Sequence, residues 1–311
     1  MLFSHYSSLF LDFKKHELKF STLDKYTNIV KDRLNPVFAD KLVTDIRPSD
    51  IKRWLYSFDD VGGKSKRIYL SILSGIMQEA LYDEVITRNP VRAVKLPKYE
   101  IKKIKPFNAD EVHQIMSLAA NDNYRYYLAI AFYTGMRSGE IIALKKSDIS
   151  FEKNTITVQR TRSRYGESAP KTSYSIREIP IIKLLTPYIK ELYYLHDNDY
   201  LFVTQYNKPY NTTNVFQEQF WKPSLKELNI PYRRPYNARH TYATNMLYNN
   251  LVTPVQLAQL LGHANTQMVF DVYVNYIDKF NDNFDRSINI YIWGVCKKTV
   301  YFLKGTWNSL K

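Results

Sequence analysis

A basic segment broken by prolines divides this chain of 311 residues into two parts. Between residues 88 and 105 a single acid, Glu100, stands against seven lysines and arginines, and Pro97 and Pro106 disfavour regular structure there. Such a composition is typical of an extended connection between folded domains. The segment could lie extended along a nucleic-acid backbone, and a solvated linker would have the same composition. The cations are Arg88, Arg92, Lys95, Lys98, Lys102, Lys103 and Lys105.

The residues before this segment predict a helical domain. Ser21 and Asp24 can cap one helix, and Pro48 suits the first turn of a second. A third, longer helix is expected after Gly62-Gly63, where apolar residues recur with a 3.6-residue period. We therefore expect helices that pack through a shared apolar face.

Three cations stand where this third helix should begin: Lys64, Lys66 and Arg67. The helix dipole disfavours positive charge at this end, so a phosphate between the side chains and the helix would improve their environment. A solvated basic turn explains the same residues. The sequence leaves both interpretations open.

The residues after the basic segment predict a mixed domain, mainly helical with a small antiparallel sheet. Asn108 and Glu111 have the spacing of a capping box at the start of the first helix. Pro254 and Gly262 are start and stop signals for a later one. Strands are expected near 149–151, 155–159 and 175–181, and later helices at 211–228, 236–249, 253–261 and 266–277.

The charge balance points to a polyanionic partner. Lysine and arginine total 44 against 30 acidic residues, a formal net charge of +14. Clustered cations bind nucleic acid by releasing its condensed counterions, so DNA or RNA is the expected partner. A protein that is merely basic and soluble is the alternative that charge alone leaves open.

Other features exclude several classes of protein. One cysteine, Cys296, excludes a disulfide framework and a multi-cysteine zinc site, and no two histidines have the spacing of a helical metal site. We therefore expect neither a metal nor another cofactor. No apolar run reaches the roughly 20 residues that a membrane span needs, and the N-terminus lacks a basic leader. We expect a cytoplasmic protein without a membrane partner.

Short polar clusters separated along the second part of the chain carry the chemical signal. Each one alone is weak, because an arginine near a helix start or a histidine after a glycine is commonly structural. Their order and spacing are specific. The clusters are Thr134-Gly135-Met136-Arg137-Ser138-Gly139-Glu140, Pro170-Lys171-Thr172, Ala238-Arg239-His240-Thr241 and Leu261-Gly262-His263, with Tyr273 ten residues after the last.

In these clusters the chain resembles the tyrosine recombinase, or phage integrase, family. The resemblance runs from about residue 1 to about residue 280 and implies a helical, SAM-like core-binding domain followed by a mixed catalytic domain with the fold of DNA breaking-rejoining enzymes. The expected divisions are a core-binding domain at 1–97, a basic linker at 98–106, a catalytic domain at 107–285 and a tail at 286–311. The tail, by the same resemblance, docks on a neighbouring protomer, and no arm-site domain is expected.

The resemblance also implies catalytic roles. Arg137 and Arg239 would be the two catalytic arginines, Lys171 the lysine on the sheet hairpin, His263 the later histidine and Tyr273 the nucleophile. Their chemistry fits phosphoryl transfer, because planar guanidiniums can hold the non-bridging oxygens of a phosphodiester as negative charge grows on them. Tyr273 would attack the phosphorus, and Lys171 would protonate the leaving 5′-oxygen. His263 would either donate a hydrogen bond to the same phosphate or help to deprotonate the tyrosine.

Supporting residues are expected around these. Glu140 is expected to orient a neighbour, and His240, which follows the second arginine as in the family, to be a buried orienting residue. Many members carry a histidine or lysine shortly before that arginine, whereas this chain has Asn237, which can donate to phosphate but cannot exchange a proton. Tyr276, one turn beyond Tyr273, is the competing nucleophile.

The implied activity is site-specific DNA recombination, by integration or excision, through a 3′-phosphotyrosyl intermediate. The expected partner is double-stranded DNA, bound by a homotetramer at the nucleoid, with DNA-bending proteins as candidate accessory factors. A topoisomerase with the same chemistry and a weakened DNA-binding prophage relic are the alternatives. The residues expected to contact DNA are Lys64, Lys66, Arg67, Lys95, Lys98, Lys102, Lys103 and Lys105.

Overall fold

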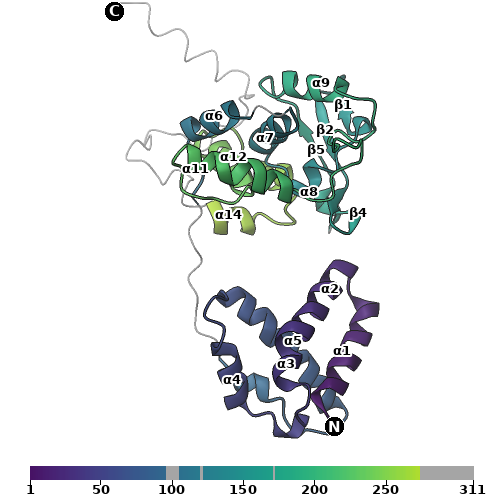
Figure 1. Cartoon of the computed structure of the whole chain (residues 1–311). Coiled ribbons are helices and arrows are strands. Elements are labelled where there is room, and N and C mark those ends of the chain that lie inside the picture. The colour runs from purple at the N-terminus through teal and green to yellow at the C-terminus, as the bar shows by residue number, and fades with distance from the viewer. Residues whose placement is uncertain (96–104, 120–121, 171, 274–311) are drawn as a thin grey trace, which may run out of the picture. The chain divides into compact units, whose positions relative to one another are not determined.

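A computed structural model of the chain describes residues 1–95, 105–119, 122–170 and 172–273. Contacts between residues divide the chain into two compact units, Met1–Lys103 and Ile104–Lys311, and Figure 1 draws both of them. In the described part of the chain, no helix is both long enough and apolar enough to cross a membrane.

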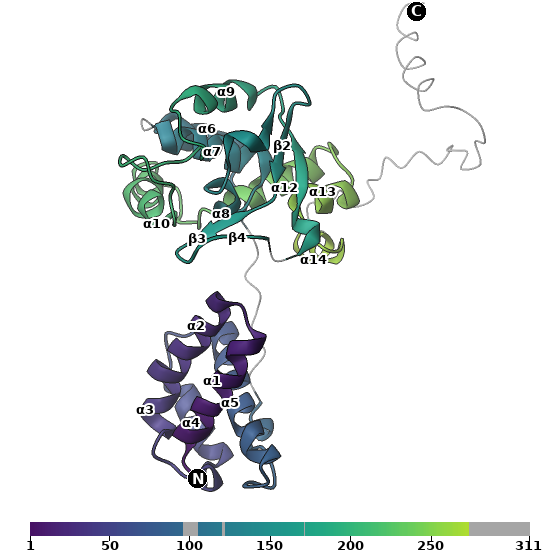
Figure 2. The ribbon, with the colours of Figure 1, turned by 90° about the vertical axis from the view of Figure 1, so that its right-hand side faces the viewer.

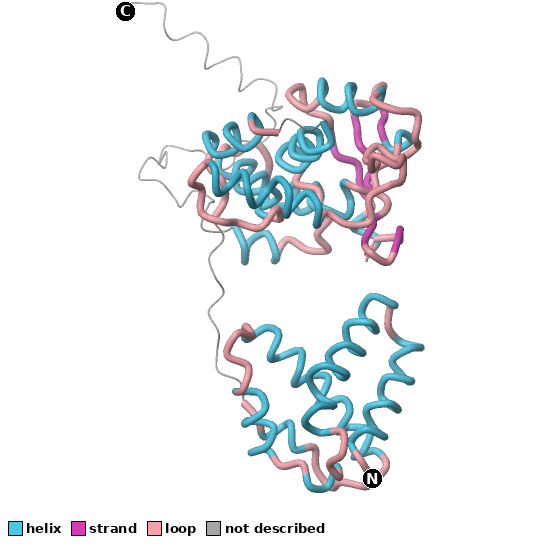
Figure 3. The backbone as a smooth tube through the Cα atoms, viewed as in Figure 1, coloured by secondary structure: helices cyan, strands magenta, loops and turns pink. Residues whose placement is uncertain are grey.

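Among the described residues of unit 1, the regular elements are helices joined by loops (Figures 1 and 3). A π-helical turn lies between α2 and α3, and the three form an unbroken helical stretch over residues 20–38. The indole of Trp54 donates to the carbonyl oxygen of Arg33 within that turn at 2.9 Å, which satisfies a backbone group. The elements are α1 (Phe3–Glu17), α2 (Phe20–Ile29), η1 (Val30–Leu34), α3 (Asn35–Phe38), η2 (Val43–Asp45), α4 (Pro48–Tyr56), α5 (Gly63–Tyr82) and η3 (Pro90–Ala93).

The core of unit 1 forms where α1 crosses α5. Phe10 of α1 lies against Gly75 of α5 so closely that a Cβ at Gly75 would sit 2.5 Å from the Phe10 ring. Aromatic rings from α3 and α4, Phe38 and Trp54, pack edge to face in the same core, with ring centroids 5.5 Å apart. The apolar faces expected from the helical period therefore meet in one interior.

The predicted start of α2 is wrong by two residues. The helix begins at Phe20 after the extended residue Lys19, whose carbonyl accepts the first backbone bonds from Thr22 and Leu23. Ser21 is already inside the first turn, so its hydroxyl does not cap the helix. The starts of α4 at Pro48 and of α5 after Gly62 agree with the sequence.

Unit 2 combines helices with two small antiparallel sheets, and the strands gather on one side of it (Figure 3). Its elements are α6 (Ala109–Ser117), α7 (Asp122–Thr134), α8 (Ser138–Ile141), η4 (Lys146–Asp148), β1 (Ile149–Ser150), β2 (Thr155–Val158), β3 (Thr161–Ser163), β4 (Gly166–Ser168), η5 (Ser173–Ser175), β5 (Arg177–Pro180), α9 (Thr186–Tyr194), α10 (Asn214–Phe216), η6 (Gln217–Trp221), α11 (Lys222–Glu227), α12 (Asn237–Tyr248), α13 (Pro254–Leu261) and α14 (Gln267–Tyr273).

The three predicted strands form one sheet in the order β1-β2-β5, which confirms the expected antiparallel sheet. In its register Ile156 pairs with Ile179, and both side chains face the core. The hairpin of β3 and β4 was not predicted, and it lies next to α8 in Figure 2. Its strands carry no alternating apolar residues, so they give no strand signal.

Helix α7 is the centre of unit 2. Most of its residues are buried, and α12 packs along it (Figure 1). The predicted capping box starts α6: Asn108 accepts from the Glu111 amide at 2.8 Å, and Glu111 accepts from the Asn108 amide at 2.9 Å. The helix expected at 211–228 is instead the succession α10, η6 and α11, while α12 and α13 keep their predicted ranges to within a residue. The predicted site residues Arg137, Arg239, His263 and Tyr273 lie just after α7, in the first turn of α12, just after α13 and at the described end of α14.

Candidate active site

A tight turn after α7 places Arg137. Gly135 has a left-handed backbone, with φ at 64°, and its amide donates to the Ala131 carbonyl, so the helix stops there. A Cβ at Gly135 would lie 2.5 Å from the ring of Tyr242 on α12, which leaves room only for glycine. Arg137 then precedes α8 as its N-cap, with its side chain 35% exposed.

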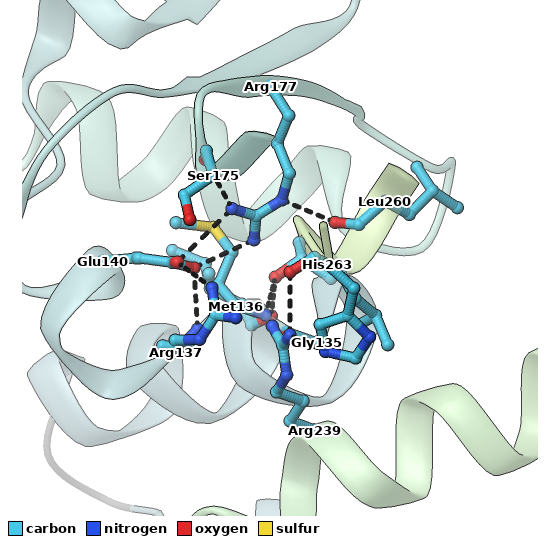
Figure 4. Close-up of polar contacts among 12 residues, drawn as sticks. Gly135, Met136, Arg137, Glu140, Ser175, Arg177, Arg239, Leu260 and His263 are labelled. Carbon is cyan, nitrogen blue, oxygen red and sulfur yellow. Dashed lines mark hydrogen bonds and ion pairs between the residues drawn. The ribbon is translucent and has the colours of Figure 1, made fainter. Parts of the chain in front are cut away.

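Arg239, in the first turn of α12, is the buried centre of the site. It is 2% exposed, and its guanidinium donates to the carbonyl oxygens of Gly135 at 2.8 Å and Leu261 at 2.7 Å (Figure 4). Its Nη2 also lies 2.9 Å from Nε2 of His263. One guanidinium thus joins the ends of α7 and α13 to the start of α12. Burial and the charge of Arg137 lower the pKa of Arg239 to about 10, so it stays positively charged at neutral pH.

A second left-handed glycine places His263. Helix α13 ends at Gly262, with φ at 67°, and the amide of His263 donates back to the Ala258 carbonyl at 2.9 Å. This is the stop signal predicted from the sequence. A Cβ at Gly262 would lie 3.0 Å from the Arg177 guanidinium, so the glycine also lets β5 approach the helix end.

Glu140 holds two arginines. Its carboxylate accepts from Nη1 of Arg137 at 2.7 Å and from Nη2 of Arg177 at 2.9 Å, and Figure 4 shows it between the two guanidiniums. Burial alone would raise the pKa of Glu140, but the hydrogen bond and charge of Arg177, with those of Arg137, bring the net shift downward. Glu140 is therefore ionised at neutral pH, and its carboxylate contacts Arg137, the neighbour it would orient.

Arg177 is a site residue to which the sequence analysis assigned no role. It is buried on β5, donates from Nε to the Leu260 carbonyl at 2.6 Å, and ties α13 to Glu140 (Figure 4). A signal was present, because Arg177 alternates with Glu178 and so shares the buried face of β5 with Ile179. A buried arginine needs an acidic partner, and Glu140 is that partner.

His263 carries an unpartnered nitrogen in this cluster. Its Nε2 is paired with Arg239, while its Nδ1 is buried and has no hydrogen-bond partner among the described residues. Burial, followed by the charges of Arg239, Arg137 and Arg177, lowers the pKa of His263 to about 4. The ring is neutral at pH 7. Since Arg239 can only donate, Nε2 must accept and Nδ1 carries the hydrogen, which makes it a donor without an acceptor.

Tyr273, at the described end of α14, is 2% exposed and lies beside His240 of α12. Its Oη is 2.7 Å from Nδ1 of His240. Burial raises the pKa of Tyr273, and the charge of Arg239 opposes that rise, which places the phenol within reach of the arginine's field. Burial and Arg239 lower the pKa of His240 to about 4. The predicted orienting histidine thus contacts the predicted nucleophile.

Tyr236 is a second residue that the sequence did not indicate. Its ring meets the His240 ring edge to face, with centroids 5.0 Å apart, and it is near enough to influence the pKa values of Arg239 and Tyr273. Nothing in the sequence distinguishes it among 26 tyrosines. Its position depends on how α12 begins.

Other predicted residues lie apart from this cluster or outside the described residues. The Asn237 amide donates to the Lys105 carbonyl at 3.1 Å, so its bond runs to the start of unit 2 rather than to the arginines. In unit 1, Lys64 and Arg67 are exposed in the first turns of α5, and Lys66 lies over the Tyr56 ring. Exposed Lys95 and Lys105 border the undescribed segment. Lys98, Lys102, Lys103, Lys171 and Tyr276 fall outside the described residues.

The arrangement suits an anion rather than a metal. Across the described residues, no three histidine, cysteine or acidic side chains gather closely enough to hold a metal ion. Instead, the guanidiniums of Arg137 and Arg239 lie near His263, whose Nε2 is 2.9 Å from Nη2 of Arg239, and Glu140 supplies a carboxylate to Arg137 (Figure 4). Such donors match the oxygens of a phosphate.

Two family models match the chain. The phage integrase family model matches residues 105–279, and the model of the phage integrase N-terminal SAM-like domain matches residues 2–58. The chain belongs to the phage integrase family. It is an enzyme of the tyrosine recombinase class, which breaks and rejoins DNA. The family resemblance drawn from the sequence is confirmed.

The relatives and solved structures agree with this assignment. A tyrosine recombinase XerC-like protein of Caldanaerobacter subterraneus subsp. tengcongensis is 27% identical over 300 residues, covering 85% of this chain and 75% of that protein. A Tn1549 transposon integrase, solved with a circular intermediate DNA, has a TM-score of 0.75 at 18% identity and covers 91% of this chain and 96% of that one. For a lambda integrase tetramer on a Holliday junction, the TM-score is 0.73 at 21% identity, with 90% and 80% covered. The predicted fold class is confirmed.

Proposed function

We propose that this integrase cuts and rejoins DNA at a specific site, with Tyr273 as the nucleophile and a 3′-phosphotyrosyl bond as the intermediate. The observation that carries the proposal is the convergence of Arg137, Arg239 and His263 in one cluster, with Tyr273 held against α12, the helix that bears Arg239. Relatives named as integrases and recombinases favour this activity over a topoisomerase or an inactive relic.

The two arginines have different parts in holding the phosphate. Arg239 is fixed by the Gly135 and Leu261 carbonyls, so its position costs no reorganisation during reaction. Arg137 is more exposed and is held from behind by Glu140, which leaves its other donors able to meet a non-bridging oxygen. His263 would donate from Nδ1 to the same phosphate.

The chemistry is an in-line displacement that needs no cofactor. The Tyr273 oxygen forms a bond to phosphorus, and the bond from phosphorus to the 5′-oxygen breaks. That oxygen takes a proton from Lys171, which the family resemblance assigns as the acid. The 5′-hydroxyl of another strand then attacks the phosphotyrosine and displaces Tyr273. The energy of the broken bond is kept in the intermediate, so no ATP is consumed.

The domain roles follow the same proposal. Residues 1–97 would form the core-binding domain, 98–106 the basic linker, 107–285 the catalytic domain and 286–311 a tail that docks on a neighbour. The cations at the start of α5 and along the linker would bind the DNA backbone. A tetramer would act on two duplexes, with DNA-bending proteins as accessory factors. Its place would be the nucleoid, in the cytoplasm.

A nicked DNA substrate tests the activity. Footprinting on DNA flanking the gene would locate the bound site, and a duplex of that site with a nick beside the cleavage point would then be prepared. The short fragment that carries the 5′-hydroxyl diffuses away after cleavage, so rejoining stops and the adduct accumulates. We expect a DNA-linked band of the protein in a denaturing gel, absent in Tyr273→Phe.

Two controls make this experiment decisive. Tyr206→Phe, at an exposed position, should form the adduct as the wild type does. Tyr276→Phe tests the competing nucleophile, and loss of the adduct there with its retention in Tyr273→Phe would show that Tyr273 is not the nucleophile. Relaxation of supercoiled DNA without any site preference would favour a topoisomerase instead.

A further inference from the structure

We propose that His240 is the base that removes the proton from Tyr273 as the tyrosine attacks, and the acid that returns it when the DNA strand is rejoined. The inference rests on the proposed function and adds a reacting group to it. From the sequence, His240 is expected to be an orienting residue only. The proposal makes it a catalytic residue, because it touches the oxygen that reacts.

The geometry of one hydrogen bond carries the proposal. Nδ1 of His240 lies 2.7 Å from Oη of Tyr273, within the range for transfer of a proton between them. The two residues are 33 positions apart and come from α12 and α14, so the contact is a product of the fold rather than of local sequence. Tyr273 is 2% exposed, which leaves bulk water little access to its hydroxyl.

The hydrogen of this bond belongs to the phenol. In the described part of the chain, His240 is the hydrogen-bond partner that the structure gives to the Tyr273 hydroxyl. If Nδ1 carried the hydrogen, the phenolic O–H would be left buried without an acceptor, which is costly. We therefore assign the tautomer with hydrogen on Nε2, in which Nδ1 offers a lone pair to the phenol.

The other histidine of the site cannot take this role. Nε2 of His263 already accepts from Nη2 of Arg239 at 2.9 Å, so its lone pair is used. Protonating that ring would break this bond and add a cation beside Arg137, Arg177 and Arg239, the charges that oppose its ionisation. The two histidines therefore have different roles: His263 donates a hydrogen bond to the phosphate, and His240 accepts the proton of Tyr273.

The step balances in protons and electrons. The O–H bond of Tyr273 breaks, its hydrogen forms a bond to Nδ1 of His240, and the freed oxygen pair forms the bond to phosphorus. The leaving 5′-oxygen takes its own proton from Lys171. On rejoining, the incoming 5′-hydroxyl loses its proton to Lys171, and the imidazolium of His240 returns its proton to the departing Tyr273 oxygen.

The charges around His240 explain how its basicity changes with substrate. The groups that face it are Arg239, Tyr236, Tyr273 and His263. Without DNA, burial and Arg239 lower the pKa of His240 to about 4. A phosphate bound by the guanidiniums brings a negative charge that offsets Arg239, so the ring becomes a better base when substrate arrives. The phenol becomes more acidic as its oxygen bonds to phosphorus, which favours the transfer at that moment.

Replacing His240 with asparagine separates proton transfer from positioning. Asparagine keeps an acceptor oxygen near the place of Nδ1 and can hold the Tyr273 hydroxyl, but it cannot take a proton. We expect His240→Asn to bind the nicked duplex as the wild type does and to form adduct about 10²- to 10⁴-fold more slowly. His113→Asn, at an exposed position on α6, is the matched control and should keep the wild-type rate.

The pH profile gives a readout that a structural role would not move. Wild-type cleavage should change little over the neutral range, because neutral His240 is available throughout it. In His240→Asn the proton must leave to solvent hydroxide, so the rate should rise about tenfold per pH unit. Free imidazole should restore part of the rate to His240→Ala in proportion to its neutral fraction, which covers the case in which the asparagine variant fails to fold.

The outcomes distinguish this inference from the proposed function. Absence of a Tyr273 adduct in the wild type would contradict the proposed function itself. If the wild type forms the adduct and His240→Asn forms it equally fast with the same pH profile, His240 only positions the tyrosine and the inference is overturned. Failure of imidazole to restore any rate to a folded, DNA-binding His240→Ala would overturn it as well.

Discussion

Arg177 of β5 donates both of its terminal nitrogens to the carboxylate of Glu140, with 2.9 Å between Nη2 and Oε2, across 37 positions of sequence. The same carboxylate accepts from Arg137, the first of the two arginines proposed to hold the phosphate, at 2.7 Å. Through Glu140, Arg177 on the sheet therefore helps to position the guanidinium of Arg137, which lies in the turn after α7. Loss of the carboxylate charge would affect folding and catalysis together.

Glu140→Gln is expected to destabilise the protein by about 3 kcal/mol, because it leaves the buried Arg177 without its counter-charge. The side chains of Glu140 and Arg177 are 4% and 6% exposed, so water cannot replace the missing partner. Urea unfolding followed by circular dichroism measures the effect. Glu218→Gln removes an exposed pair with Lys222 and should change the unfolding free energy by less than about 1 kcal/mol. Equal effects of the two variants would contradict a buried ion pair.

Acid is expected to weaken the protein in two separate pH windows. His240 and His263 have folded pKa values near 4 against an ordinary value of 6.5, so between these pH values the unfolded chain binds more protons than the folded one. Stability should therefore fall as pH drops from about 6.5 toward 4. Glu140, whose pKa is lowered, loses its contribution only below its ordinary value of 4.5.

Urea midpoints between pH 7 and pH 5 test the histidine window. The wild-type midpoint should fall across this range, and the fall should be smaller in His240→Asn, which has no proton to gain. Because His263 still gains a proton over the same range, we expect a weaker pH dependence of the midpoint in His240→Asn rather than none. A slope that is the same in both proteins would show that His240 is not held neutral by the fold.

Replacement by lysine should affect the two arginines that are proposed to hold the phosphate in different ways. Arg137→Lys is expected to lower the rate of adduct formation by about 10²- to 10³-fold, as for loss of one oriented donor, with little change in stability because a lysine can still pair with Glu140. Arg239→Lys should lose catalysis and also stability, since it leaves the buried Gly135 and Leu261 carbonyls without donors. Single-turnover cleavage and urea unfolding separate the two effects. Matching stability losses in both variants would refute this distinction.

The sequence predicted those parts of the fold that local signals determine. The capping box of Asn108 and Glu111 and the helix stop at Gly262 were correctly placed, because each depends on residues within one turn. The β3–β4 hairpin was missed because it depends on charged and aromatic contacts: Glu167 accepts from the Tyr200 hydroxyl at 2.6 Å, and Arg162 lies over the Tyr200 ring. No periodic pattern encodes such contacts.

For the candidate site, too, the sequence identified some features and left others unpredicted. Family order and spacing indicated Arg137, Arg239, His263 and Tyr273, but residue order gives no distances. The contact between His240 and Tyr273 depends on how α12 and α14 pack, and the role of Arg177 depends on how β5 approaches α13. These are tertiary relationships, so a single sequence could name the residues and leave their partners undetermined.

Gly262→Ala tests whether the end of α13 sets the position of the site. Its left-handed backbone, with φ at 67°, costs an alanine about 1 to 2 kcal/mol, and the new Cβ would lie 3.0 Å from the Arg177 guanidinium. We expect a stability loss above that range in urea unfolding, with slower adduct formation because Arg177 and the adjacent His263 are displaced. Gly166→Ala is the matched control, since its φ is also positive, at 92°, but its Cβ would meet nothing within 4 Å. This variant should lose only the stability that backbone strain removes, and its cleavage rate should stay unchanged. If both alanines lowered stability equally and neither slowed cleavage, close packing at Gly262 would have no part in positioning the proposed site residues.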